Sequence, residues 1–435
     1  MKIAVIGGSG EFGRLFAAQF KEDGHEVTIT GRDVHKGEKV AQELGVAFTT
    51  DNVAAAKASD VVMISVYIEN TLEVIEEVAP HVRTGCLLMD VTSVKEEPCA
   101  AMEKFAGKDV EIMGTHPMFG PRVTSMEGLT FILTPVRVKK WKGFVMDFLE
   151  KQGAKVFSTT PEEHDRMMSV VQGLTHFAYI SAASTLRELN VDVGKTRNFA
   201  SPVYELMLDL IARIVGQSPQ LYASIQMHNP RVKEVHEVFI DEARKLSSIV
   251  KEKDVGSFTK LMANAARHLG DIDASMGRSD KAIRALTSEL KRLRESVGKE
   301  VALKHIYSGA VHIGVVKDVA PDEVSIENKS GKKVTLKLSN VELLSWQELR
   351  RWKSENLSMD KRDFSVLFPG EVDEETVRVV VKNMDHKIVS CSVLDTYAGK
   401  QIPEGKKSIT IRVEAVDFDL AKVEDLLKGL GGVIR

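Results

Sequence analysis

Cysteine is scarce in this sequence, and long apolar runs are missing. Cys86, Cys99 and Cys391 are the only cysteines, and their spacing fits neither a metal site nor a disulfide framework, which favours a reduced, intracellular chain. No apolar run approaches the roughly 18 residues that a membrane span requires. The start MKIAVIGGSG is too short and too Gly-rich for a signal peptide. We therefore expect a cytoplasmic protein without a membrane segment and without a bound metal.

An excess of charge of one sign is also absent. The sequence holds 59 Lys and Arg residues against 62 Asp and Glu residues, so neither a bulk nucleic-acid binder nor a membrane-surface protein is indicated. A length of 435 residues exceeds what one hydrophobic core normally serves. We therefore expect about two to four domains.

The N-terminal 33 residues have the pattern of a dinucleotide-binding βαβ unit. The run KIAVIGG predicts a strand, GEFGRLFAAQFKEDG a helix and HEVTITGRD a second strand. The turn between the first two fits G-x-G-x-x-G and consists of Gly8, Ser9, Gly10, Glu11, Phe12 and Gly13. In that context Gly8 permits the tight turn, Gly10 lets a pyrophosphate approach the backbone, and Gly13 lets the helix pack on the strand. The helix N-terminus would bind the phosphates.

The end of the second strand bears on the choice of cofactor. NAD sites usually carry an acidic residue there, which binds the ribose hydroxyls. This sequence reads Thr30-Gly31-Arg32-Asp33, so Gly31 takes the expected acidic position and Arg32 follows at once. An arginine suits the 2′-phosphate, and we therefore predict NADP. NAD stays possible if Asp33 takes the acidic position through a turn shifted by one residue.

Strands and helices alternate up to about residue 158, which predicts a doubly wound α/β Rossmann-type domain over residues 1–158. In such sheets, ligands bind beyond the carboxyl ends of the strands. Ser65, Ser93 and His116 each come at the end of an expected strand, and the stretch GTHPMFGP would continue from His116 as a rigid loop. These three polar residues are expected to converge where the nicotinamide lies.

Residues 159–298 read as consecutive helices and predict an all-α domain for substrate binding and dimerisation. Thr160 is the expected cap of its first helix, with Glu163 completing a capping box. His176 lies on a mostly apolar helix and is either a satisfied core histidine or a ligand-binding one. Arg213 in LIARIV is expensive to bury alone, so either Asp209 pairs with it along the helix or an anionic ligand does.

The last third of the sequence predicts two further units. Residues 299–350 alternate in polarity, with a hairpin signal at Lys329-Ser330-Gly331-Lys332, and indicate a small β domain. Residues 360–435 read strand, helix, strand, strand, helix, strand, which is the order of a ferredoxin-like α+β domain.

Four blocks of the sequence, taken in order, resemble prephenate dehydrogenase of tyrosine biosynthesis. They are DVTSVKEEP (90–98), GTHPMFGP (114–121), EEHDRMMSVVQGLTHFAY (162–179) and SPVYELMLDLIARIVGQSPQLYASI (201–225). The resemblance covers about residues 1–275 and is nearest to the dehydrogenase part of the bifunctional chorismate mutase–prephenate dehydrogenases. The mutase helices are absent from this sequence, so no mutase activity is expected.

The resemblance implies an oxidative decarboxylation of prephenate to 4-hydroxyphenylpyruvate, with hydride passing to NAD(P). It implies His116 as the catalytic base and Ser93 as its active-site partner. It also implies that Arg213 binds a substrate carboxylate and that His176 binds substrate. Lys95 would either add positive potential or face solvent. The role of Arg122, just after the second proline of the block, is undefined.

Three other functions stay open from the sequence. Arogenate, with an amino group in place of the side-chain keto group, could be the substrate instead of prephenate. A different NADP-linked reductase would suit the N-terminal region, although it would give HPMFGP and Arg213 no purpose. A redox-sensing regulator without catalysis would use the C-terminal extension to bind a partner, although the complete set of Ser93, His116 and Arg213 argues against it.

Residues 394–413, LDTYAGKQIPEGKKSITIRV, resemble the ferredoxin-fold anticodon-binding domain of phenylalanyl-tRNA synthetases. The stretch has four basic residues but also Asp395 and Glu404, and Tyr397 is its only aromatic residue. A strong RNA surface needs more basic charge and more stacking rings. Nucleic-acid binding is therefore not expected. The expected role is either regulatory, with an aromatic amino acid such as tyrosine as effector, or structural and oligomerising.

Overall fold

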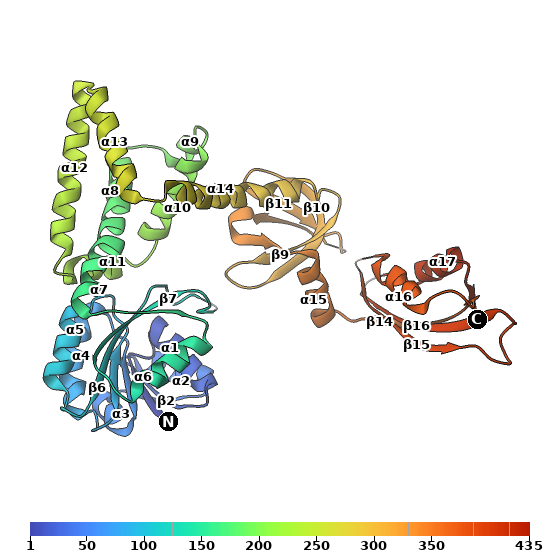
Figure 1. Cartoon of the computed structure of the whole chain (residues 1–435), viewed down its shortest axis with the longest axis horizontal. Helices are drawn as coiled ribbons and strands as arrows, with labels where there is room; N and C mark the ends of the chain where they lie inside the picture. Colours follow the sequence, from blue (N-terminus) through green and yellow to red (C-terminus); the bar gives the residue numbers. More distant parts are fainter. Residues whose placement is uncertain (124, 329, 386, 417) are drawn as a thin grey trace. The chain divides into compact units, whose positions relative to one another are not determined.

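The computed structural model describes the chain from Met1 to Arg435 apart from Thr124, Lys329, His386 and Asp417. It divides into two compact units, Met1–Gly270 and Asp271–Arg435, which are described separately (Figure 1). All three cysteines are buried and free. No helix among the described residues is both long and apolar enough to cross a membrane.

The first unit begins with an eight-stranded sheet in the order β3-β2-β1-β4-β5-β6-β7-β8. Its strands are β1 Lys2–Ile6, β2 Glu26–Thr30, β3 Ala47–Thr49, β4 Val61–Ile64, β5 Leu87–Asp90, β6 Glu111–Pro117, β7 Thr130–Arg137 and β8 Lys155–Ser158. Strands β1 to β6 run parallel, whereas β7 is antiparallel to β6 and parallel to β8. The order of the first six strands is that of a doubly wound dinucleotide-binding fold, and it confirms the predicted fold class.

Helices cover both faces of this sheet because its central strands are apolar on both sides. The helices are α1 Glu11–Glu22, α2 Val34–Leu44, α3 Asn52–Ala58, α4 Ile68–Val78, the 3₁₀ turn Ala79–His81, α5 Glu96–Phe105 and α6 Trp141–Lys151. Along β1, Ile3 and Val5 face the core that holds α1 and α6. Ala4 and Ile6 face the core that holds α3, α4 and α5. The two-residue period of the strand thus serves two cores at once.

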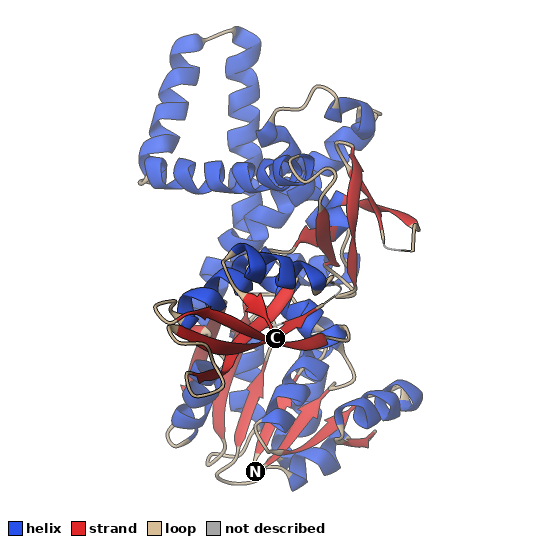
Figure 2. Cartoon of the chain, turned by 90° about the vertical axis from the view of Figure 1, so that its right-hand side faces the viewer, coloured by secondary structure: helices blue, strands red, loops and turns tan. Residues whose placement is uncertain are grey.

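Residues 161–270, all of them described, form helices and no strand (Figure 2). They are α7 Pro161–Met168, the π-helix η2 Ser169–Leu174, α8 Thr175–Glu188, α9 Val193–Arg197, α10 Pro202–Val215, α11 Pro219–His228, α12 Val232–Glu252 and α13 Val255–Leu269. Thr160 caps α7 as expected, accepting the amide of Glu163 at 3.2 Å. The capping box is only half made, because the Glu163 carboxylate binds Arg166 instead.

The second unit starts with a helix that the sequence placed in the helical domain. This helix, α14 Ile272–Arg294, packs on the following sheet, and its Leu293 is fully buried in that sheet's core. The sheet has the order β12-β11-β10-β9-β13. Its elements are β9 Glu300–His305, β10 Val311–Val319, β11 Glu323–Glu327, β12 Lys333–Lys337, the 3₁₀ turn Leu338–Asn340 and β13 Val341–Leu343, followed by α15 Trp346–Asn356. The hairpin predicted at 329–332 joins β11 to β12, with Lys329 itself outside the described residues.

The C-terminal part has the expected strand–helix–strand–strand–helix–strand order. Its elements are β14 Asp360–Pro369, α16 Glu374–Asn383, β15 Ile388–Tyr397, β16 Lys406–Ala415, α17 Ala421–Gly429 and β17 Val433–Ile434. The antiparallel sheet has the order β15-β16-β14-β17. Both helices pack on one face of it, through Val377, Val381, Val423 and Leu427. This arrangement confirms the predicted ferredoxin-like fold.

Candidate active site

The turn between β1 and α1 is shaped for a phosphate-bearing ligand. A Cβ on Gly8 would lie 2.6 Å from the Cβ of Ile29, and one on Gly13 would lie 2.6 Å from the carbonyl oxygen of Gly7. Gly10 caps α1 without any side-chain hydrogen bond. Because the first amides of a helix have no partner within the helix, they stay available to an anion. The residues present therefore fit a bound dinucleotide.

The remaining residues of the fingerprint surround this turn. Ser9 lies in it, with its Oγ 2.4 Å from where a Cβ on Gly31 would be. Glu11 and Phe12 are the first two residues of α1, the former exposed and the latter half-buried against the core. The side chain of Glu11 thus faces solvent.

The acidic residue near the end of β2 is already engaged. Asp33 accepts the amide of Lys36 at 3.0 Å and so caps helix α2. Gly31 directly follows β2 and offers no side chain, while Arg32 is exposed. The only charged side chain between β2 and the Asp33 cap is therefore a cation.

The three expected strand-end residues lie at one edge of the sheet. Ser65 directly follows β4 and is buried, and Ser93 is half-buried three residues beyond β5. His116 lies one residue before the end of β6, opposite Ile132 of β7, and is only 3% exposed, so the loop expected to continue from it starts slightly later. Since β4, β5 and β6 are parallel neighbours, all three positions share the ligand-binding edge.

His116 begins a chain of hydrogen bonds that runs into the helical part. Its Nδ1 lies 2.9 Å from Nε2 of His164, whose Nδ1 lies 2.7 Å from Oδ1 of Asp165. Asp165 also accepts the amides of Lys95 at 2.8 Å and Glu96 at 2.9 Å. Burial lowers the pKa of His116 well below its usual value, with smaller contributions from His164 and Lys95. Burial also lowers the pKa of His164, against an opposing effect of Asp165. Both imidazoles are thus neutral near pH 7.

Lys95 does not face solvent, so that interpretation of the sequence is wrong. The residue is fully buried, and its ammonium group pairs with the Asp90 carboxylate and lies 3.2 Å from Oγ1 of Thr92. A Cβ on Gly114 would lie 3.0 Å from Cδ of Lys95 and closer still to two other side chains. The glycine of GTHP therefore leaves room for the lysine beneath the strand that carries His116.

The π-helix η2 places a second polar group at His116. The side-chain nitrogen of Gln172 lies 3.5 Å from Nε2 of His116, and its Oε1 is buried without a partner among the described residues. Single π-turns are rare and occur often at functional sites. The Nε2 side of His116 thus faces a polar group that still has an unused acceptor.

His176 and Arg213 lie around Tyr222, on α8, α10 and α11. The rings of His176 and Tyr222 meet edge to face, with centroids 4.5 Å apart. Arg213 acts electrostatically on Tyr222. Burial lowers the pKa of His176 to about 4, and its Nδ1 has no partner among the described residues. His176 is therefore not a fully satisfied core histidine.

Arg213 is exposed, so the cost of burying an unpaired arginine does not apply to it. The expected partner Asp209 is bound by Arg197, at 3.4 Å. Within the described part of the chain no ion pair is formed by Arg213, and its guanidinium is free to bind an anionic ligand.

The sequence did not point to His164 and Asp165 as site residues. In the sequence the pair falls in the first turns of a predicted helix, a position that is usually exposed. The adjacent His and Asp were the available signal. If both side chains are buried, each must be hydrogen-bonded, because burying them without partners is costly. The contact with His116 spans 48 positions of the chain, and no local pattern reveals it.

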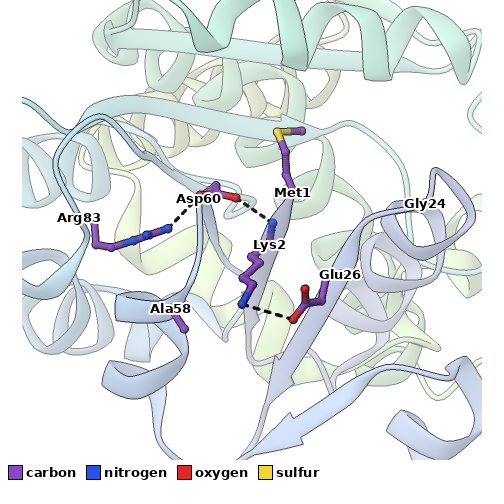
Figure 3. Close-up of a pocket in the computed structure, with 7 residues that line it drawn as sticks. All are labelled: Met1, Lys2, Gly24, Glu26, Ala58, Asp60 and Arg83. Atoms are coloured by element: carbon purple, nitrogen blue, oxygen red, sulfur yellow. Dashed lines mark hydrogen bonds and ion pairs between the residues drawn. The ribbon is translucent and has the colours of Figure 1, made fainter.

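One cavity lies at the other end of the sheet and is not this site. It measures about 580 Å³ and is lined by Met1, Lys2, Gly24, Glu26, Ala58, Asp60 and Arg83 (Figure 3). Its charges are already paired with one another: Arg83 binds Asp60 at 2.9 Å and Lys2 reaches Glu26 at 3.7 Å. It lies at the start of β1, away from the edge where such folds bind cofactors.

A phosphate-binding turn, a doubly wound sheet and a buried neutral histidine at the ligand edge are together typical of a dinucleotide-dependent dehydrogenase with a helical second domain. Comparison with known proteins refines this class. Residues 16–158 match the family model "Prephenate dehydrogenase, nucleotide-binding domain" and residues 160–264 match "Prephenate dehydrogenase, dimerization domain". Residues 359–420 match "Ferredoxin-fold anticodon binding domain".

Individual relatives agree with these matches. The chain is 48% identical to a probable arogenate/prephenate dehydrogenase of Methanocaldococcus jannaschii, over 100% of this chain and 98% of that protein. It is 28% identical to the T-protein of Haemophilus influenzae, over 67% of this chain and 73% of that protein. The chain belongs to the prephenate/arogenate dehydrogenase family of oxidoreductases.

A solved structure shows the same fold. It is prephenate dehydrogenase from A. aeolicus in complex with hydroxyphenyl propionate and NAD⁺, with a TM-score of 0.53 and 22% identity. The alignment covers 62% of this chain and 98% of that chain. The part of the chain beyond this coverage has no counterpart in that structure.

Proposed function

We propose that this protein is a prephenate dehydrogenase that prefers NADP and forms 4-hydroxyphenylpyruvate in tyrosine biosynthesis. The observation that supports it most is the buried neutral His116 at the nicotinamide edge, with its Nε2 turned toward Gln172 rather than into the core. A neutral imidazole at that place can accept a proton from a substrate hydroxyl.

The chemistry requires a group that takes up a proton and returns it. Bound nicotinamide would accept the C4 hydrogen of prephenate as hydride. His116 takes the C4 hydroxyl proton at the same time, which leaves a C4 carbonyl. The bond from C1 to its carboxylate then breaks, CO₂ leaves, and its electron pair makes the ring aromatic and places negative charge on the C4 oxygen. His116 returns the proton to that oxygen, so no net proton is consumed.

Ser93, Arg213 and His176 are proposed to hold the substrate. Ser93 is half-buried at the same edge as His116 and would bond the C4 hydroxyl. Arg213 is exposed without an ion pair in the described structure and would bind a substrate carboxylate through two parallel hydrogen bonds. His176 has an unused ring nitrogen and would make a polar contact to the substrate side chain.

The preference for NADP rests on the end of β2. Asp33 is engaged in capping α2, Gly31 offers no side chain, and Arg32 is an exposed cation. This combination favours a 2′-phosphate over a free ribose hydroxyl. Ser65 and the residues Gly8 to Gly13 would contact the cofactor, in line with the close approach that the glycines allow.

Arogenate is the second candidate substrate, because the name of the Methanocaldococcus jannaschii relative carries both substrates. The two differ only in the amino or keto group of the side chain. His176, held neutral by burial, is better suited to a neutral keto group than to an ammonium group that also needs a negative partner. We therefore favour prephenate.

One assay tests both proposals. Purified protein is incubated with prephenate or arogenate and with NADP or NAD, while the absorbance of reduced nicotinamide and the ring product are followed. We expect the highest kcat/KM with prephenate and NADP. Absence of turnover with all four combinations would disprove the proposed activity, and faster turnover of arogenate would replace the substrate.

A further inference from the structure

The proton-accepting histidine of the proposed reaction lies in a difficult environment. His116 is almost fully buried and lies near the charged ammonium group of Lys95. A proton gained there would place positive charge in an apolar site beside a like charge, which is costly. A device that shares or relocates this charge is therefore needed if His116 is to act as a base.

The hydrogen bonds around Asp165 define which atoms carry protons. Its carboxylate accepts two backbone amides, from Lys95 and Glu96, so it acts as an ionised acceptor. The third bond, at 2.7 Å, therefore has Nδ1–H of His164 as its donor. A neutral His164 then has a bare Nε2, which accepts Nδ1–H of His116 across 2.9 Å. His116 is left with its lone pair on Nε2, the atom that faces Gln172.

We propose that His164 and Asp165 form a positioning pair, which fixes His116 as its Nδ1–H tautomer and holds the substrate proton until it is returned. When Nε2 of His116 takes the proton, Nδ1–H can shift to Nε2 of His164. The positive charge then lies beside the Asp165 carboxylate and farther from the reacting carbon. Reversal of the shift delivers the proton to the phenolate oxygen. This inference rests on the proposed function for its second half, whereas the tautomer follows from the geometry alone.

Every charged group that faces the pair fits this role. Asp165 on α7 raises the pKa of His164, and Asp90 at the end of β5 does so more weakly. Lys95, before α5, opposes both of them, but its own charge is matched by Asp90 at the buried ion pair. A further ion pair, nearer the surface, joins Nε of Arg231 to Oε1 of Glu96 at 2.8 Å. A single added proton is thus best held between His164 and Asp165.

Substitution of His164 by glutamine tests whether His164 only orients His116 or also holds the proton. The amide oxygen of a glutamine reaches about as far as Nε2 and can accept Nδ1–H of His116, but it does not take up a proton. For His164→Gln we expect kcat with prephenate to fall about 10-fold to 100-fold, while KM changes less than about 2-fold. The acidic limb of the kcat/KM profile should move to lower pH, because only the less basic His116 is left to titrate.

Arg166→Gln is the matched control on the same helix. Arg166 makes an exposed i,i+3 pair with Glu163, and such pairs contribute little, so kcat and the pH profile should stay those of the wild type. A His164→Gln enzyme with kcat within 3-fold of the wild type overturns the proposal. So does a lower kcat with an unmoved acidic limb, since a merely structural defect would give that result.

Nitrogen-15 NMR of the histidine rings tests the tautomer without any variant of the pair. We expect His116 and His164 both to carry their proton on Nδ1 at pH 7, with His116 assigned from the spectrum of His116→Asn. A proton on Nε2 of His116 overturns the proposal even if His164→Gln fails to fold. Because this spectrum needs no substrate, failure of the tautomer and failure of the proposed activity are distinguishable.

Discussion

Burial keeps three histidines of the first unit neutral. Desolvation is the largest cause of the lowered pKa of His116, of His164 and of His176, the last falling to about 4. A neutral ring is the form that can accept a proton or a hydrogen bond from a substrate. This burial also makes the stability of the fold depend on pH. At acid pH the unfolded chain binds protons on these histidines more readily than the folded chain does, which lowers the free energy of unfolding.

The first prediction therefore concerns pH and stability. Each of these histidines has a folded pKa below its unfolded value near 6.5, so its contribution is complete above that pH. For His176 that contribution is lost as the pH falls from about 6.5 through about 4. The free energy of unfolding, measured by urea titration between pH 7 and pH 4, should fall with acidity. His176→Phe should reduce that slope, and an unchanged slope would contradict the assignment.

Arg32 supports the second prediction, on the choice of cofactor. Removal of an exposed cation that binds the 2′-phosphate should raise KM for NADP by about 10-fold, since one charge-assisted contact is worth about 1.5 kcal/mol. KM for NAD should change little in Arg32→Ala. The control is Lys39→Ala, which removes an exposed cation from the following helix α2. It should leave both KM values unchanged. An equal loss for both cofactors in Arg32→Ala would rule out the NADP assignment.

At the level of elements, the β1–α1 turn depends on contact between two backbones. A Cβ on Gly13 would lie 2.6 Å from both the carbonyl oxygen of Gly7 and Cα of Gly8. Since neither atom belongs to a flexible side chain, helix α1 has to move away from the strand if any side chain is added. The amides proposed to bind phosphate would move with the helix.

Gly13→Ala is the third prediction. It should weaken cofactor binding at least 10-fold, measured by fluorescence titration, and lower the melting temperature. Gly143→Ala in α6 is its matched control, because a Cβ there meets no atom within 4 Å. Alanine also favours a helix interior over glycine by roughly 0.5 to 1 kcal/mol, so this control should be neutral or slightly stabilising. Equal effects of the two substitutions would show that the close contact is unimportant.

The sequence predicted elements well where the signal was local. The fingerprint glycines, the strand ends at Ser65 and His116 and the ferredoxin-like order all follow from short patterns. Packing between segments far apart in the sequence could not be predicted from such local patterns. The sequence assigned α14 to the helical domain, whereas Leu293 buries that helix against a sheet later in the chain. The anchoring of the start of α5 is of the same kind, because the amides of Lys95 and Glu96 bind Asp165, about 70 residues away.

The same distinction applies to the candidate site. His116 and Ser93 are predicted as site residues from their positions at strand ends and from the family resemblance. The depth of Lys95 and its pairing with Asp90 were not, because a short charged run such as SVKEE is equally typical of a solvated turn. Nonlocal burial decides whether a charged side chain tunes a site or only faces water.

For the whole molecule, the helical part of the first unit exposes several large apolar side chains. Its most exposed large apolar side chains are Phe199, Met227, Val255 and Leu269, each at least 74% exposed. The matched family model of this part is called a dimerization domain, and such exposed side chains are available to a partner surface. We therefore propose a homodimer formed through these helices.

The fourth prediction is the mass in solution. Light scattering after gel filtration should give twice the chain mass of 48.1 kDa at micromolar concentration. Introduction of a charge by Val255→Glu should shift the equilibrium toward the monomer. Exposed Lys260→Glu, on the same helix α13, changes charge without touching the apolar surface and serves as the control. A mass of one chain across all concentrations would contradict the dimer.

The second unit has its own two cores and a polar open face on its last sheet. Arg412 binds Asp363 there through two hydrogen bonds of 2.7 and 2.8 Å, and Lys361 binds Glu414 at 2.8 Å. Because these basic groups are already paired with carboxylates of the sheet, they are less available to bind the phosphate backbone of a nucleic acid. This favours a regulatory or structural role over RNA binding, and titration of the whole protein with tyrosine, phenylalanine and tRNA distinguishes these roles.

The most direct test of the account is the turnover of prephenate by the wild type and by His116→Asn. Both proteins are mixed with prephenate and NADP, and the appearance of reduced nicotinamide is followed, with exposed His268→Asn as the control. We expect rapid turnover by the wild type and the control. For His116→Asn we expect a kcat lower by about 10² to 10⁴ with KM for prephenate nearly unchanged. A kcat within a few-fold of the wild type would contradict the central claim that His116 is the base.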